Sequence, residues 1–169
     1  MISARSKPKL GRYMEKLHDA LTDLAQEYRK LGERHATEHD LYQLCHTLAK
    51  QCEGQAEALR PHASRHAGDV PDDVDEGPRE SMLAGLRRAT AALVGRSPAT
   101  GLLLLRDLRQ LHLAIEEAAM LWLIVGQGAQ AARDRELLVV VEHCREEITH
   151  QLMWIQTRIK ETAPQVLVS

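Results

Sequence analysis

Aromatic side chains are scarce in this sequence: phenylalanine is absent, and aromatic residues make up 3% of the chain. Leucine, alanine, glutamate, arginine and glutamine are abundant instead. Because strands favour aromatic and β-branched side chains, whereas the abundant residues favour helices, the composition predicts an all-α protein. A chain of 169 residues can bury roughly 70% of its unfolded surface in one core, so we expect a single domain over residues 1–169.

A surplus of charge is also lacking, since 22 Lys and Arg residues stand against 24 Asp and Glu residues. The net charge of -2 provides no general attraction to nucleic acids or anionic membranes, and we expect neither as a partner. The start of the chain is a local exception, because Arg5, Lys7, Lys9 and Arg12 precede the first acid, Glu15. We interpret residues 1–9 as a flexible, solvated basic arm.

Long hydrophobic runs are missing as well. The most apolar stretch, residues 118–126, is about nine residues long, whereas a helix needs about 20 residues to cross a bilayer. The basic start is followed by no apolar run, so it lacks the pattern of a secretory signal. Cys45 and Cys52 are two helical turns, about 10 Å, apart, which is too far for a disulfide. We therefore expect a cytoplasmic protein with reduced thiols.

Apolar residues recur every three or four positions in four segments, as in helices with one buried face: about residues 10–32, 35–66, 98–132 and 134–164. Asp134 is a typical N-cap, and Pro164 is expected to end the last helix. An alternative places the last turn at Gly126 to Gly128. The apolar stripes are Met14, Leu17, Leu21, Leu24, Tyr28 and Leu31; Leu41, Leu44, Cys45, Leu48, Cys52 and Leu59; Leu104, Leu108, Leu111, Ile115, Ala118, Trp122 and Val125; and Leu137, Val141, Cys144, Ile148, Leu152, Ile155 and Ile159.

The connection between the second and third helices is long. Residues 67–78 contain two prolines, two glycines and five acids and predict a loop, while residues 79–94 predict a short extra helix. Two short hairpins joined by some thirty residues predict a four-helix bundle with one long crossover. A simple up-down-up-down bundle also fits the pattern.

The last helix carries a motif with chemical meaning. It opens with the sequence DREL at residues 134–137 and continues with EITH at residues 147–150, which resembles the fourth helix of the ferritin-like four-helix-bundle superfamily. The resemblance implies a bundle that binds two iron or manganese ions through carboxylates of the first and third helices and a Glu-x-x-His motif in each of the other two. Side chains three residues apart share a helix face, so a carboxylate and an imidazole can reach one ion.

Carried over residue by residue, the resemblance implies ligands near the middle of each helix. The second helix departs from the pattern, because it has no Glu-x-x-His and carries His39, His46 and Glu53 at heptad spacing instead. A second Glu-x-x-His, formed by Glu15 and His18, falls on the first helix. The candidate ligands are Glu147, His150 and His143 in the fourth helix, Glu116 or Glu117 in the third, Glu27 in the first and His46 in the second.

Helical angles oppose the metal hypothesis. At about 100° per residue, the apolar stripe of the last helix centres near Ile148, whereas the group containing Glu147 and His150 centres about 130° away. His46 and Glu116 are likewise turned away from the stripes of their helices. Because metal ligands of a bundle project into its core, we favour a solvated surface and a protein without catalysis, with iron or manganese binding as the alternative.

Other catalytic patterns are missing from the sequence, which has no glycine-rich phosphate loop, no Cys-x-x-Cys, no His-Glu-x-x-His and no nucleophile elbow. Cys45, Cys52 and Cys144 fall on apolar stripes, which is typical of unreactive core cysteines. His62 and His66 lie among arginines at the end of the second helix. We interpret them as cations at a helix end rather than as an anion site.

The third helix is apolar nearly all round, and a helix of this kind must be buried on more than one face. We therefore expect a self-associating protein, a homodimer in which this helix packs near its symmetry mate. Glu117 would then need a partner, such as an arginine of the facing subunit. The alternative cover is the short helix over residues 79–94 of the same chain. The residues expected in the dimer contact are Leu113, Met120, Leu121 and Ile124.

Overall fold

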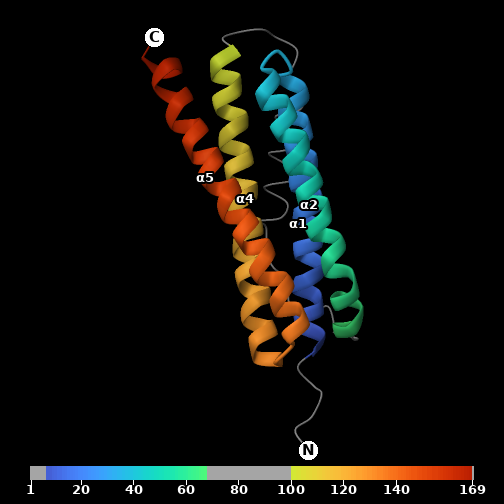
Figure 1. Ribbon diagram of the computed structural model, residues 1–169. Helices are drawn as coiled ribbons and strands as arrows, with labels where there is room; N and C mark the ends of the chain where they lie inside the picture. The colour runs from blue at the N-terminus through green and yellow to red at the C-terminus, as the bar shows by residue number, and fades with distance from the viewer. Residues whose placement is uncertain (1–6, 68–99, 169) are drawn as a thin grey trace, which may run out of the picture.

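The computed structural model describes residues 7–67 and 100–168, which form four long helices and no strand. Figure 1 shows these helices side by side in one elongated bundle. The predicted all-α four-helix bundle is therefore confirmed, whereas the extra helix over residues 79–94 and the acidic loop after Ala67 lie outside the described residues. The helices are α1 (Lys7–Arg34), α2 (His39–His66), α4 (Thr100–Ala132) and α5 (Arg135–Leu167).

The directions of the helices fix the topology. α1 and α2 run antiparallel, and so do α4 and α5 (Figure 1). His66, at the end of α2, contacts Asp134 at the start of α5, while His35, just after α1, contacts Asp107 near the start of α4. α2 therefore ends at one end of the bundle, and α4 begins at the other. Both helices thus run in the same direction, which excludes the up-down-up-down alternative.

Each helix has two neighbours. α1 packs against α2 and α4, and α5 packs against α4 and, less closely, against α2. The diagonal pairs, α1 with α5 and α2 with α4, have no Cα atoms within 8 Å of each other among the described residues. The molecule thus consists of two tight hairpins that are joined closely along α1 and α4 and more loosely along α2 and α5.

The core is built by the apolar stripes that the sequence predicts. All stripe residues of α1 are at most 2% exposed, and those of α4 are buried as well. α2 and α5 depart in part from the prediction. Four predicted stripe residues are only half-buried, and Gln151 of α5 is buried instead; the four are Leu44, Leu48, Leu152 and Ile159. Leu44 and Gln151 both face the side on which α2 and α5 lie further apart.

Two glycines allow α1 and α2 to approach closely at the two ends of their hairpin. A Cβ atom on Gly11 would lie 2.5 Å from the backbone oxygen of His66, and one on Gly32 would lie 3.1 Å from Cβ of Cys45. A backbone oxygen cannot yield as a flexible side chain can. Any larger residue at position 11 would therefore push the end of α2 away from α1.

The turn between α4 and α5 follows the first of the two predicted alternatives, since α4 continues to Ala132. Arg133 adopts the left-handed conformation with φ 54, and the N–H of Asp134 donates to the carbonyl of Ala129 at 3.0 Å, which closes α4 as a glycine often does. The Asp134 carboxylate accepts from the N–H of Leu137 at 3.0 Å. Asp134 is therefore the N-cap of α5, as predicted.

Several helix ends differ from the sequence prediction, and α2 begins at His39 rather than near residue 35. α5 continues through Pro164 to Leu167, so the prediction that Pro164 ends this helix is wrong. Proline removes a single N–H donor, and the residues after it can still bond to the carbonyls of the preceding turn. α1 begins at Lys7, so residues 7–9 of the expected flexible arm are helical, and residues 1–6 lie outside the described residues.

Candidate functional site

Among the candidate metal ligands, two of the residues on α5 lie close together. Nε2 of His143 is 3.4 Å from Oε1 of Glu147, although the His143 side chain is 71% exposed. His150, the other half of the Glu-x-x-His motif, is exposed to solvent. The two residues of the motif therefore differ in burial, since Glu147 is partly buried and His150 is exposed.

The candidate ligands on the other helices have local neighbours of their own. Glu27 is paired with Lys30 at 2.9 Å on α1, and Glu116 lies 3.6 Å from His112 on α4, one turn away. His46 packs its ring against Tyr42, with the ring centroids 4.4 Å apart. Glu117, the alternative to Glu116, is exposed. These contacts hold each side chain against its own helix rather than toward a shared centre.

The set of ligands that the ferritin-like resemblance implies does not fit this structure. Within residues 7–67 and 100–168, no group of three or more His, Cys, Asp or Glu side chains could hold a metal ion. Helical phase explains the mismatch, since the buried face of α5 carries Ile148 and Gln151, whereas His150 is turned outward.

Two neighbouring hydrogen-bonded groups of polar side chains occupy the middle of the bundle instead, and together we call them the polar layer. The hydroxyl of Tyr28 donates to Oε1 of Gln151 at 2.9 Å, and Nε2 of Gln151 donates to Gln51 at 2.7 Å. Nε2 of Gln55 donates to Glu147 at 2.7 Å, while the indole N–H of Trp122 donates to Oε1 of Gln55 at 3.2 Å. The polar layer consists of Tyr28 from α1, Gln51, Cys52 and Gln55 from α2, Trp122 from α4, and Glu147 and Gln151 from α5.

Burial keeps two groups of the polar layer protonated, the Tyr28 hydroxyl and the Cys52 thiol. It raises the pKa of the Tyr28 hydroxyl well above its usual value, and the pKa of the Cys52 thiol is raised to about 12, mainly by burial. A protonated thiol is a poor metal ligand and a poor nucleophile. Glu147 is thus the only carboxylate in a layer of amides and neutral donors, which suits hydrogen bonding between helices rather than cation binding.

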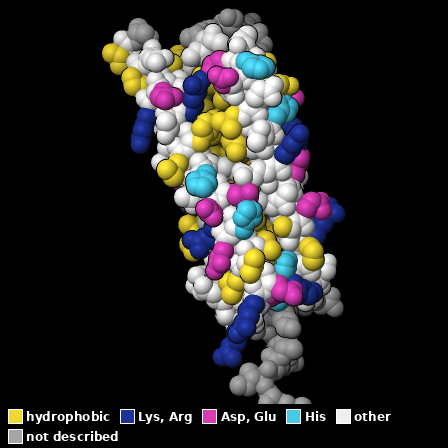
Figure 2. All heavy atoms as spheres, viewed as in Figure 1, with side chains coloured by type: hydrophobic (Ala, Val, Ile, Leu, Met, Phe, Trp, Pro, Cys, Tyr) yellow, Lys and Arg dark blue, Asp and Glu magenta, His cyan; other side chains and the backbone are white. Residues whose placement is uncertain are grey.

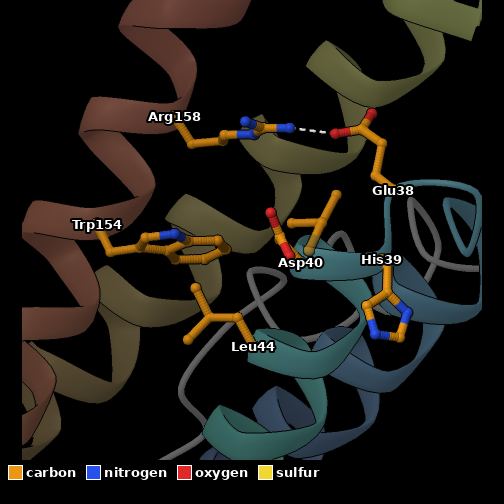
Figure 3. Close-up of a pocket in the computed structure, with 7 residues that line it drawn as sticks. Glu38, His39, Asp40, Leu44, Trp154 and Arg158 are labelled. Carbon is orange, nitrogen blue, oxygen red and sulfur yellow. Dashed lines mark hydrogen bonds and ion pairs between the residues drawn. The ribbon is translucent and has the colours of Figure 1, made fainter.

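The looser side of the bundle has a hollow at its upper end. Figure 2 shows hydrophobic side chains gathered there, and Figure 3 shows Trp154 reaching from α5 toward α2 above Leu44. The hollow has a volume of about 370 Å³. Arg158, at its rim, is already paired with Glu38, so its charge is not free for an anionic ligand. The Nε atom of Arg158 is buried and has no hydrogen-bond partner, at the rim of this largely apolar hollow. We assign no ligand to the hollow.

Each end of the bundle is closed by a buried pair of histidine and aspartate. His35 lies 3.0 Å from Asp107, which also accepts from Arg34 at 2.7 Å and from Arg106 at 3.0 Å. At the other end His66 lies 2.9 Å from Asp134. These pairs join separate helices at both ends.

The charges at these ends shift the pKa values of their partners. Burial alone would raise the pKa of Asp107, but hydrogen bonds from His35 and the arginines outweigh it and lower the pKa. The pKa of Asp134 is also lowered, because hydrogen bonds from His66 and from the N–H of Leu137 outweigh the effect of burial. The pKa of His62 is lowered by burial and by the nearby Arg65. Because the acids of α5 already engage this end of α2, no free anion site is formed.

The outer face of α4 is the largest unexplained feature of the described surface. Five large apolar side chains of this helix are exposed, whereas the other described helices expose at most three such residues each. Three of the dimer residues predicted from the sequence are among them, and the fourth, Leu121, is half-buried. The exposed fractions on α4 are 54% for Leu102, 42% for Leu113, 57% for Met120, 38% for Leu123 and 38% for Ile124.

Sequence reasoning missed the polar layer, although a signal was present. Gln55 lies three residues after Cys52 and four before Leu59, which is a core position of α2. Gln151 lies in the same way between Ile148 and Ile155. A polar residue on an apolar stripe needs a buried partner, and that criterion would have identified both glutamines.

Comparisons with known proteins identify no family for this chain. No protein-family model, no curated protein and no solved structure matches the chain. In the part of the chain that the structure describes, none of the helices has the length and hydrophobicity needed to span a bilayer.

Proposed function

We propose that this protein is a non-catalytic helical bundle that acts through self-association, as a homodimer joined along α4. The observation that carries the proposal is the exposed apolar surface of α4, on which Leu113, Met120 and Ile124 lie opposite the buried stripe. Exposed apolar patches of this kind on one element are typical of protein interaction sites. Burying them would release roughly 25 cal/mol for each Å² of apolar surface removed from water.

The absence of catalysis in this proposal rests on the state of the nucleophiles. Cys45, Cys52 and Cys144 are buried, and burial raises the pKa of each thiol to about 12. At neutral pH such thiols carry almost no thiolate, which is the reactive form. Buried, reduced thiols also favour the cytoplasmic location that we propose for the protein.

The arrangement of helices supports a ferritin-like architecture as part of the proposal. Two antiparallel hairpins joined by a long connection, with α2 and α4 running in the same direction, are the layout of ferritin-like bundles. The metal function of that superfamily does not follow, because fold and function are separable and the polar layer lacks the required donors. We therefore propose a ferritin-like bundle that has a hydrogen-bonded layer in place of a metal centre.

Light scattering after size-exclusion chromatography tests the self-association. We expect the wild-type chain to have the mass of a dimer at micromolar concentration, and Met120→Glu to have the mass of a monomer with unchanged helicity by circular dichroism. Met153→Glu is the matched control, since Met153 is 62% exposed but lies on α5. This variant should remain dimeric.

A monomeric wild type at micromolar concentration would contradict the proposal. So would a dimer that Met120→Glu and Ile124→Glu leave intact, because the contact would then lie on another face. Dissociation by Met153→Glu together with Met120→Glu would show a general effect of added charge instead of a contact on α4.

A further inference from the structure

The outer face of α4 has an internal symmetry that suggests how two copies meet. Between residues 102 and 124, seven side chains lie within about 40° of Leu113 around the helix axis, counting about 100° per residue. The buried Ile115 lies about 160° from Leu113 by the same count. We call these residues the α4 outer stripe: Leu102, Arg106, Arg109, Leu113, Glu117, Met120 and Ile124.

The spacing of the α4 outer stripe is the same in both directions. Counted from Leu113, the stripe residues follow at four, seven and eleven positions toward either end of the helix. A twofold axis through Leu113, perpendicular to the helix, therefore brings every stripe residue level with a stripe residue of an antiparallel copy. An isologous dimer needs this kind of self-complementary surface.

Building on the proposed self-association, we infer that two copies of this chain pair their α4 helices antiparallel about an axis through Leu113, so that Arg109 of each copy meets Glu117 of the other. Leu113 packs on Leu113 of the second copy. Leu102 lies level with Ile124 of the second copy, and Arg106 lies level with Met120.

The charges of the stripe agree with this register. Arg109 and Glu117 are both exposed, and they lie at equal distances on opposite sides of Leu113. In the antiparallel register each dimer gains two ion pairs of opposite charge. A parallel register would instead place each of these charges against its own copy, with Arg109 facing Arg109, and like charges in contact oppose association.

The remaining stripe residues are also compatible with the register. Leu102 and Ile124 are both apolar and exposed, so their contact buries hydrophobic surface at each end of the seam. Arg106 donates to its neighbour Asp107 at 3.0 Å, which pairs the charge of its guanidinium group within one copy. Its aliphatic stem is then available to cover Met120 of the second copy.

Cysteine cross-linking tests the direction and register of the helices. Interaxial distances of about 8–10 Å and a helix radius of about 2.3 Å leave Cα atoms at the axis about 3.4–5.4 Å apart, and a disulfide can bridge the upper part of this range. We expect Leu113→Cys to cross-link with itself under mild oxidation. Leu102→Cys and Ile124→Cys should cross-link only when the two variants are mixed. The wild-type chain is the control, since its three cysteines are buried.

Charge exchange tests the ion pairs. Arg109→Glu and Glu117→Arg should each raise the dissociation constant of the dimer roughly 30-fold, because two like-charge contacts replace two ion pairs. An equimolar mixture of the two variants restores both pairs and should form a mixed dimer close to wild-type affinity. The double variant Arg109→Glu/Glu117→Arg should also dimerise.

The outcomes separate this inference from the proposed function on which it rests. A wild type that is monomeric overturns both. A dimer in which Leu102→Cys cross-links with itself shows a parallel pairing and overturns the register alone. The register is also overturned if the dimer tolerates Arg109→Glu without loss of affinity, or if mixing the two charge variants restores nothing.

Discussion

The two seams that join the hairpins differ in chemistry. Along α1 and α4 the helices lie close together, since a Cβ atom on Gly128 of α4 would come within 2.7 Å of Leu10 of α1. Along α2 and α5 the helices stand further apart, and long polar side chains connect them, such as Gln55 with Glu147 and Gln151 with Gln51. Burial holds most of the close seam, with Asp107 of α4 paired to Arg34 and His35 at one end. Along the wider seam, hydrogen bonds between side chains connect the helices.

The largest effect that this comparison predicts concerns the two tryptophans. Trp122 is fully buried, whereas Trp154 is half-buried at the hollow of the wider seam. Trp122→Ala should lower the free energy of unfolding by about 4 kcal/mol, because it leaves a cavity and removes the hydrogen-bond donor to the side-chain oxygen of Gln55. Trp154→Ala should cost about 1–2 kcal/mol, since much of that ring already contacts water. Urea denaturation followed by circular dichroism measures both values.

If Trp122→Ala and Trp154→Ala lowered the free energy of unfolding equally, the wider seam would be packed as tightly as the core, and the two seams would not differ as described above. Trp122→Phe sharpens the test. It keeps a six-membered ring but removes the five-membered ring with its N–H donor to Gln55, so its loss combines a smaller cavity with the lost hydrogen bond. Of this loss we expect about 1–2 kcal/mol to come from the hydrogen bond.

The contrast between the seams also marks what the sequence could predict. Helical phase alone placed the core residues of α1 and α4, because one apolar stripe meets another where helices touch. It also predicted the capping of α5 by Asp134, which depends only on local geometry. Pro164 was misjudged, since a proline weakens a helix without always ending it.

The wider seam could not be derived in the same way. Helical phase correctly predicts that His150 and Glu116 point away from the core. It also predicts a solvated Glu147, whereas the Glu147 carboxylate accepts a hydrogen bond from Gln55. The distance between two helices decides whether a residue at the edge of the stripe is solvated or bridges to a neighbour. That distance depends on tertiary packing, which the periodicity of a single helix does not contain.

The ends of the bundle should differ in their response to acid. A carboxylate whose folded-state pKa is lowered contributes stability above its unfolded pKa near 3.9, and this contribution is lost as the pH falls through the folded-state value. The stabilising contributions of Asp107 and Asp134 are therefore lost progressively below about pH 5. His62, whose pKa is also lowered, adds a loss of the same sign below about pH 6.5, where the unfolded chain takes up the proton first.

Asp107 has more charged partners than Asp134, so it should contribute the larger part of the acid sensitivity. Asp107→Asn should cost about 2 kcal/mol at pH 7 and should flatten the decline in unfolding free energy between pH 5 and pH 3. Asp134→Asn, which keeps an N-cap, should flatten it less. Urea titrations at a series of pH values measure this decline. If the unfolding free energy of Asp107→Asn fell with pH as steeply as that of the wild type, Asp107 would not be a source of the acid sensitivity.

The smallest effect is expected from metal ions, and it tests whether the wider seam is only a hydrogen-bonded layer. A site with a dissociation constant 100-fold below the free metal concentration would stabilise the fold by about 2.7 kcal/mol, which a thermal melt detects easily. The neutral amides and protonated Cys52 of the polar layer offer no such site, so iron, manganese or a chelator should leave the melting temperature unchanged. Elemental analysis of protein purified without chelators should find less than stoichiometric metal. If two equivalents of iron or manganese were found, and Glu147→Gln and His150→Ala lost them while the control His112→Ala kept them, the α5 motif would bind metal after all and the polar layer would be its apo form.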